Sequence, residues 1–153
     1  MKIVAVAEAA ASRIQAIPLL GDSRIQILTE RQGDLNQKIT TALSKLGLSV
    51  VIVTPDVDIL QHVGPEIRVN VRLVAEVSEL PLVNQSATGS GVPALAAATA
   101  ILKALHRAPN GLDEGEHRPR LNEFRLPEEQ PLRLIPDKRN IVYHVTAYTE
   151  VII

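Results

Sequence analysis

The sequence predicts a two-layer α/β (α+β) domain, with about three helices packed on one face of a mixed or antiparallel sheet of about four to five strands. Three observations point to this fold class. Residues 66–78 alternate apolar and polar side chains, as a long strand with one buried face does. The alanine-rich segment 93–107 follows as an apolar helix. Residues 140–153 alternate again, as a second long strand.

Composition is typical of one globular domain spanning residues 1–153. The chain has 153 residues, of which 46% are hydrophobic and 22% are charged, and this length can bury a core without disulfides or metals. It contains no cysteine, which excludes disulfides, thiolate catalysis and Cys-ligated zinc. Aromatic residues make up only 2%, so the core is expected to be aliphatic and base stacking has few platforms.

The first half of the chain supplies two helices and two strands. Residues 3–16 carry apolar side chains at helical spacing, and this amphipathic helix is favoured over a signal peptide because Glu8 and Arg13 interrupt the apolar run. Residues 23–30 alternate as a short strand. Asp34 is expected to cap a helix over residues 34–46. The β-branched run 49–55 predicts a buried strand that Pro55 ends, and a connection follows to residue 65.

The second half begins with the strand 66–78, whose apolar parity runs from Ile67 to Val77. A polar loop over residues 80–92 leads to the helix 93–107, with proline at its first position. Residues 108–119 predict a polar surface loop, and three prolines confine residues 120–139 to the edge of the sheet. The final strand is expected to pair with residues 66–78.

The glycines before the third helix suggest an anion site. Residues 89–94 fit the loose pattern GxGxxA at a helix N-terminus, where backbone amides can hold a phosphate. A polar spacer separates them from the preceding strand, however, and no GxxxxGK[ST] element occurs. A polar, flexible lead into the helix is the favoured interpretation, and a small ligand-binding domain using residues 84–92 is the alternative.

No catalytic, cofactor-binding or metal-ligating residues are predicted. The four histidines are scattered, without HExxH or any other paired spacing, and GxSxG does not occur. The clustered acidic residues, Asp113, Glu114 and Glu116 and the pair Glu128–Glu129, lie in polar loops, whereas acid–base catalysis needs carboxylates in a rigid, partly desolvated setting. We therefore predict a protein that is not an enzyme and that needs no cofactor.

Two surfaces are candidates for contact with a partner. One is the outward-facing set of side chains on the strand 66–78, and the other is the loop of residues 84–92, which we call the glycine loop. Mixed polar and charged side chains on a strand face can fix the register and the choice of a partner, although a solvated sheet face is the simpler alternative. The mean hydropathy of +0.12 favours assembly. The net charge of −1 argues against sequence-specific nucleic-acid binding, and no apolar run is long enough to span a membrane. The predicted interface residues are Arg68, Asn70, Arg72, Asn84, Thr88 and Ser90.

The stretch from Ile67 to His106 resembles the tail-terminator, or tail-completion, proteins of long-tailed bacteriophages and prophages. The pieces that carry this resemblance are the alternating strand VRLVAEVSE, the step LVNQ, the segment TGSGVPALAAATAILKAL and His106 after it. The helix 34–46, the strand that follows it and the final strand also suit the family. The proline-broken region 108–139 matches no pattern of the family.

The resemblance implies a structural virion protein rather than a catalyst. It implies a small α/β subunit that forms a ring, typically a hexamer, on the head-proximal end of the tail tube and contributes to head–tail joining. The implied partners are further copies of the chain, the tail tube protein and a head–tail connector or neck protein. The implied location is the virion, with assembly in the cytoplasm of the host bacterium. Another neck or head-completion protein is the alternative within the same class.

Overall fold

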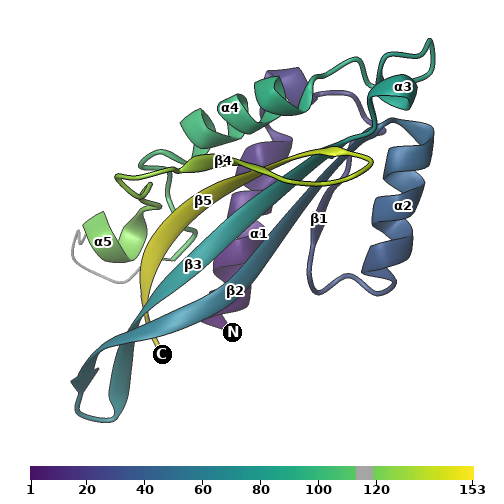
Figure 1. Ribbon diagram of the computed structural model, residues 1–153. Helices are drawn as coiled ribbons and strands as arrows, with labels where there is room; N and C mark the ends of the chain where they lie inside the picture. Colours follow the sequence, from purple (N-terminus) through teal and green to yellow (C-terminus); the bar gives the residue numbers. More distant parts are fainter. Residues whose placement is uncertain (113–118) are drawn as a thin grey trace.

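The computed structural model describes residues 1–112 and 119–153 (Figure 1). Within these residues one five-stranded sheet has the order β1-β2-β3-β5-β4, in which β1 and β2 are parallel and all other pairs are antiparallel. The predicted two-layer α/β domain with a mixed sheet is therefore confirmed. The elements are α1 (Lys2–Gln15), η1 (Pro18–Leu20), β1 (Ile27–Thr29), α2 (Leu35–Lys45), β2 (Leu48–Val63), β3 (Glu66–Glu79), α3 (Pro81–Asn84), α4 (Ala94–Leu105), α5 (Pro119–Asn122), β4 (Leu132–Ile135) and β5 (Ile141–Ile152).

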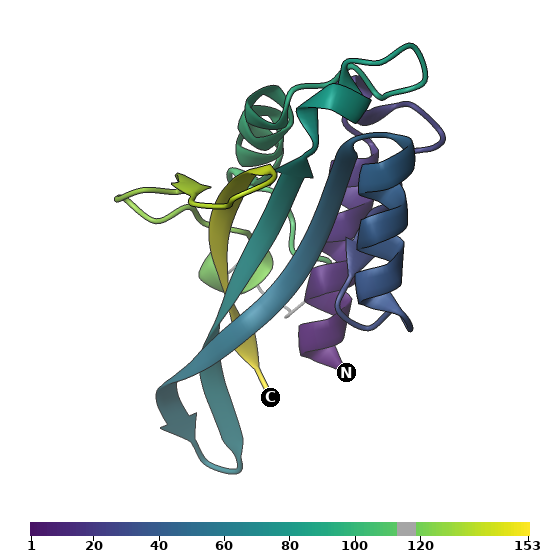
Figure 2. The same ribbon diagram turned by 45° about the vertical axis from the view of Figure 1, so that its right-hand side comes forward.

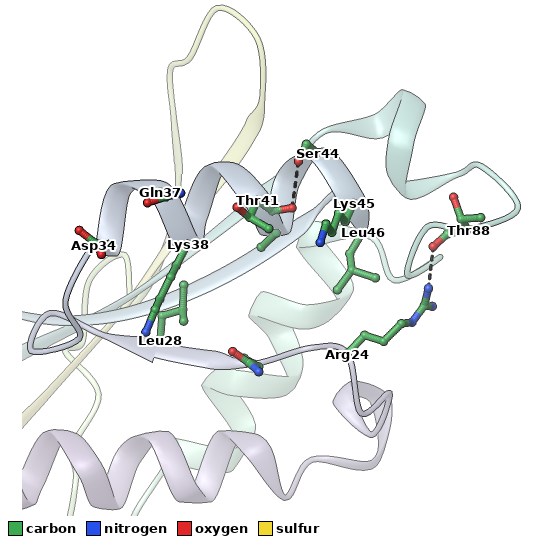
Figure 3. Close-up of a pocket in the computed structure, with 12 residues that line it drawn as sticks. Arg24, Leu28, Asp34, Gln37, Lys38, Thr41, Ser44, Lys45, Leu46 and Thr88 are labelled. Carbon is green, nitrogen blue, oxygen red and sulfur yellow. Dashed lines mark hydrogen bonds between the residues drawn. The ribbon is translucent and has the colours of Figure 1, made fainter.

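The main core lies between the sheet and the helices α1 and α4. Both helices contribute alanines and β-branched or aliphatic side chains that are fully buried, and they pack on the same face of the sheet. The small alanine side chains of α4 let its backbone approach β3 and β5 closely. The helix α2 lies on the other side of β1 from α1 (Figure 3), above Leu28. Two helices thus cover the core face, whereas α2 covers part of the opposite face, which from here on is called the outer face.

Both long strands show the predicted alternation of buried and outward-facing side chains. On β3 the side chains of Val69, Val71, Leu73, Ala75 and Val77 are buried in the core. Their neighbours on the other parity face the outer side of the sheet, where polar residues dominate. The strand β5 runs antiparallel to β3 along its whole length, from Arg68 opposite Ile152 to Glu79 opposite Ile141. The predicted pairing of the final strand with residues 66–78 is confirmed.

The predicted end of the second strand at Pro55 is wrong. The strand β2 continues to Val63 and forms a long hairpin with β3, whose tip projects beyond the rest of the domain (Figures 1 and 2). Proline is tolerated because β1 pairs with β2 only at residues 50–52, so Pro55 lies on a free edge where no donor is needed. The register also shifts between Val53 and Asp56 and again between Ile59 and Gln61, which marks two bulges.

Three smaller expectations also need revision. Asp34 does precede α2, but it has a left-handed backbone and its side chain makes no capping hydrogen bond. Pro93 lies one residue before the first helical residue of α4. Residues 119–122 form the short helix α5 rather than a strand, and residues 123–125 contribute only isolated bridges, whereas β4 is an edge strand as predicted. The predicted polar loop 108–119 falls largely on residues 113–118, which lie outside the described residues.

Candidate functional site

Two of the predicted interface residues take part in ion pairs across the outer face of the sheet. Arg72 donates from Nε and Nη2 to Asp56 Oδ2 of β2, at 2.9 and 2.5 Å, and this hydrogen bonding raises the pKa of the Arg72 guanidinium. Arg68 donates from Nε to Glu150 Oε2 of β5 at 2.8 Å. Both guanidinium groups remain partly exposed, and each has further N–H donors free for other contacts.

Polar and charged side chains face each other across the strands on the outer face. Glu76 lies directly opposite His144, and the two side chains are 2.8 Å apart between Oε2 and Nε2. Asn70 is half-buried and lies between Asp58 of β2 and Glu150 of β5 in the register. Opposite charges that face each other across strands stabilise the pairing of those strands. The face is therefore polar, but its charges are largely balanced by their own neighbours.

Asn84 is not a surface residue. Its side chain is 1% exposed, and its amide nitrogen donates to Glu79 Oε2 and to the carbonyl oxygen of Val92, both at 2.8 Å. Its amide oxygen accepts a hydrogen bond from the hydroxyl of Ser90, which is half-buried and also accepts from the Val92 amide at 3.2 Å. Of the three predicted loop residues, only Thr88 is exposed. The loop 84–92 is thus tied together by hydrogen bonds to a buried side chain.

The anion position at the start of α4 is occupied by a carboxylate of the chain itself. Glu79 is 5% exposed, and its Oε1 accepts a hydrogen bond from the Ala94 amide at 2.9 Å. A carboxylate at a helix N-terminus is stabilised by the amide donors and by the helix dipole. An external phosphate would have to displace Glu79, so the geometry argues against the glycine loop as a phosphate site. Sequence reasoning missed Glu79 because a carboxylate 15 residues before a helix carries no local signal of its role.

A second buried asparagine, Asn110, ties the segment after α4 to the sheet. Its amide nitrogen donates to the Leu121 carbonyl oxygen at 2.5 Å and to Thr149 Oγ1 of β5 at 2.8 Å. Its amide oxygen accepts from the Leu112 amide at 2.9 Å. These hydrogen bonds hold residues 110–112 and Leu121 against β5. The role of Asn110 was not predicted.

The projecting hairpin exposes apolar side chains. We call residues 54–68 the arm. Val57 lies opposite Val71 in the register, and Ile59 lies opposite Val69, so both side chains are on the core face of the sheet. The helices do not cover them, however, and Ile59 is 61% exposed. Leu60, at the second bulge, is also exposed. An apolar row that leaves the core and enters solvent on a projecting element is typical of a contact surface.

The arm also carries the longest free strand edge among the described strands. The edge of β1 is blocked, because the side-chain amide of Gln15 in α1 donates to the Ile25 carbonyl oxygen at 3.2 Å and accepts from the Ile27 amide at 3.3 Å. This amide takes the place of a neighbouring strand. On β2 the edge beyond Thr54 has no such partner, and Pro55 and the two bulges limit uncontrolled pairing there.

A cleft of about 820 Å³ lies between α2 and β1 (Figure 3). We call it the α2–β1 cleft. Its floor is apolar, from Leu28, Ala42 and Leu46, and its rim carries the cations Arg24, Lys38 and Lys45. Asp34 contributes one negative charge at the N-terminal end of α2. Of the predicted interface residues, Thr88 lines this cleft, but no sequence pattern joined it to the other lining residues, because they come from three separate segments.

Arg24, which lies just before β1, connects that segment to the glycine loop at one end of this cleft. Its Nη1 donates to the Thr88 carbonyl oxygen at 2.8 Å, and its Nη2 lies 2.7 Å from Asp22 Oδ2. The hydrogen bonds from the Arg24 side chain and then from its backbone amide lower the pKa of Asp22 to about 2. The side chains of Lys38 and Lys45 make no hydrogen bond or ion pair within residues 1–112 and 119–153, so their charges are available.

The described residues form neither a metal-binding cluster nor a membrane-spanning helix. No three His, Asp or Glu side chains of the described residues come together as a metal site. No helix in those residues combines the length and the apolar character that crossing a bilayer requires. In comparisons with known proteins, no protein-family model matches the chain and no curated protein is similar to it.

Proposed function

We propose that the protein is a structural subunit of a phage tail terminator, which forms a closed ring on the tail tube and contributes to head–tail joining. The observation that carries this proposal is the arm: a long hairpin that projects from a compact domain with exposed apolar side chains and a free strand edge. The side chains of Val57, Ile59 and Leu60 lie outside the core cluster of the domain, and an element that exposes them suits contact with another subunit. The resemblance of residues 67–106 to tail-terminator proteins favours a tail-terminator ring over other kinds of assembly.

The proposal implies a geometric mechanism. A ring forms when two different patches of one subunit meet on its neighbours and the rotation between subunits closes. The two ends of the ring then face different partners, which we propose are the tail tube protein and a connector or neck protein. In this proposal the site of action is the virion, and the ring, typically a hexamer, assembles in the cytoplasm of the host bacterium. Another neck or head-completion protein would follow the same logic.

Molar mass in solution tests the assembly directly. Light scattering over a range of concentrations is expected to show a discrete oligomer, alone or after addition of the tail tube protein from the same genome. The protein is also expected to stop the polymerisation of that tube protein, giving shorter tubes in electron micrographs. A strict monomer at high concentration that leaves tube growth unchanged would contradict the proposal.

The outer face can be tested with paired charge variants. Changing Arg68 and Arg72 together to Glu is expected to weaken assembly while the domain stays folded, because both side chains are partly exposed. The control is Arg72→Asp combined with Asp56→Arg, which inverts one ion pair and keeps the net charge. If the double Glu variant assembles like the wild type, this face is only solvated sheet.

A ligand-binding domain is the second candidate function, and the volume of the α2–β1 cleft is the observation that favours it. Thermal-shift measurements with nucleotides and phosphorylated metabolites test it, because a ligand that binds only the folded state raises the melting temperature. The absence of any shift would exclude this function for those ligand classes.

A further inference from the structure

The arm and the α2–β1 cleft lie on different sides of the molecule. In Figures 1 and 2 the tip of the β2–β3 hairpin points to the lower left, whereas α2 lies at the right. The cleft is lined by residues of α2 and therefore lies on that side of the molecule. The arm is a continuation of two sheet strands, held by a ladder of backbone pairs, so it cannot fold back into the cleft of its own chain. A contact between these two surfaces must therefore join two copies.

The arm and the cleft are complementary in chemistry. From Asp56 to Ile59 the arm alternates acidic and apolar side chains, so its two acids lie on one face and its two apolar side chains on the other. The cleft has the matching arrangement, with an apolar floor and a cationic rim. An extended segment can lie in it with the apolar side chains on the floor and the acids towards the rim.

The unpaired charges favour the same match. Asp58 makes no ion pair within the described residues, and neither Lys38 nor Lys45 makes one there. The two lysines are seven residues apart on α2, about 10 Å along the helix axis. The acids of the arm are about 7 Å apart. Flexible lysine side chains can span this difference, and the two charge sets attract each other across the contact.

We propose that the arm of one copy lies in the α2–β1 cleft of the next copy, with Asp58 close to Lys38 and Lys45 and with Ile59 on the floor at Leu28 and Leu46. The contact is heterologous, because the arm and the cleft are different patches, and it propagates from one subunit to the next until a ring closes. This inference rests on the proposed ring assembly and names the surfaces that form it.

Complementation by mixing tests the contact. One variant carries Lys38→Glu and Lys45→Glu, and the other carries Asp58→Lys. Each variant alone is expected to need at least about tenfold more protein for half-maximal assembly, since like charges then meet in every contact. An equimolar mixture is expected to regain assembly, because the reversed arm fits the reversed cleft and each unchanged arm fits an unchanged cleft. Circular dichroism checks that both variants are folded.

Cysteine cross-linking gives an independent readout. The chain has no cysteine, so single cysteines at Asp58→Cys in one copy and Thr41→Cys in another are the only thiols present. Mild oxidation of the mixture is expected to give a disulfide-linked pair between the two different variants. The matched control pairs Asp58→Cys with Glu128→Cys, which is exposed and does not line the cleft.

The outcomes separate the contact from the function. If the wild type forms a ring but the charge variants assemble normally and no specific cross-link appears, the arm-in-cleft contact is wrong and the ring stands. If the wild type stays monomeric alone and with the tube protein, both proposals fail. Restored assembly in the mixture, together with the specific cross-link, supports the contact.

Discussion

At the scale of single residues, Gly47 shows how closely the glycine loop is packed. It has a left-handed backbone, with φ of +73°, and a Cβ at this position would lie 2.2 Å from the amide nitrogen of Asn84. Gly64, at the tip of the arm, has a similar φ of +60° with no atom within 4 Å of a Cβ. The two positions therefore separate the cost of the backbone conformation from the cost of the contact.

We expect Gly47→Ala to destabilise the protein far more than Gly64→Ala. The left-handed conformation alone costs about 1 to 2 kcal/mol for a residue with a side chain. At Gly47 the loop around Asn84 must also move, which breaks its buried hydrogen bonds at about 1 to 3 kcal/mol for each group left unsatisfied. Urea unfolding of both variants measures the difference. Equal effects would mean that the loop is not held against Gly47.

The Asp22–Arg24 pair gives a prediction for pH dependence. Because the pKa of Asp22 falls from its ordinary 3.8 to about 2 in the folded protein, its carboxylate contributes stability above about pH 4. This contribution is lost as the pH falls through about 2. In Arg24→Gln the main hydrogen-bond donor is removed, so the midpoint in a carboxyl NMR titration is expected to rise towards 3.8, and the stability change between pH 4 and 2 is expected to shrink.

Asp137 is the matched control for this titration. Its pKa is lowered mainly by hydrogen bonds from the backbone amides of Asn140 and Arg139, at 2.8 and 2.9 Å. The variant Arg139→Gln keeps both amides, so the pKa of Asp137 is expected to stay below its ordinary value. A large rise in this variant would mean that side-chain charge rather than the backbone amides determines the pKa.

At the scale of elements, the arm extends the apolar face of the sheet beyond its helical cover. Changing Ile59 and Leu60 together to Ser is expected to leave the free energy of unfolding within about 0.5 kcal/mol, because both side chains are already exposed. Assembly measured by light scattering is expected to weaken. Leu82→Ser on α3 is the control, since that side chain is 88% exposed and belongs to neither the arm nor the cleft. Unchanged assembly in the double variant would remove the arm as a contact surface.

The helices and strands also show which local sequence patterns predict secondary structure correctly. The alternation of residues 66–78 and 140–153 was sufficient to predict two long strands and their buried faces, because side chains alternate between faces in any strand. Pro55 was misleading, because its effect depends on whether its edge of the strand is paired, and a sequence does not show which strand lies beside it. The αβ order likewise predicted helices against a sheet, but not that α2 would lie on the outer face.

At the scale of the whole molecule, the predicted contact residues are divided between different roles. Arg68 and Arg72 remain at the surface but balance Glu150 and Asp56, whereas Asn84 is buried and organises its loop. The arm offers Asp58, and the α2–β1 cleft offers Lys38 and Lys45, none of which makes an ion pair within the described residues. The arm and the cleft lie far enough apart to meet only between copies, and this separation is what a head-to-tail ring requires.

The sequence by itself determined the class of the fold, the aliphatic core and the faces of the two long strands, since these follow from composition and from periodicity over a few residues. The tertiary structure alone decided that Glu79 occupies the start of α4, that Arg68 meets Glu150, and that α2 and β1 enclose a cationic cleft. Each of these depends on residues brought together from distant segments, 82 positions apart for Arg68 and Glu150. Strand register and chain path, not local pattern, place such partners within reach of each other.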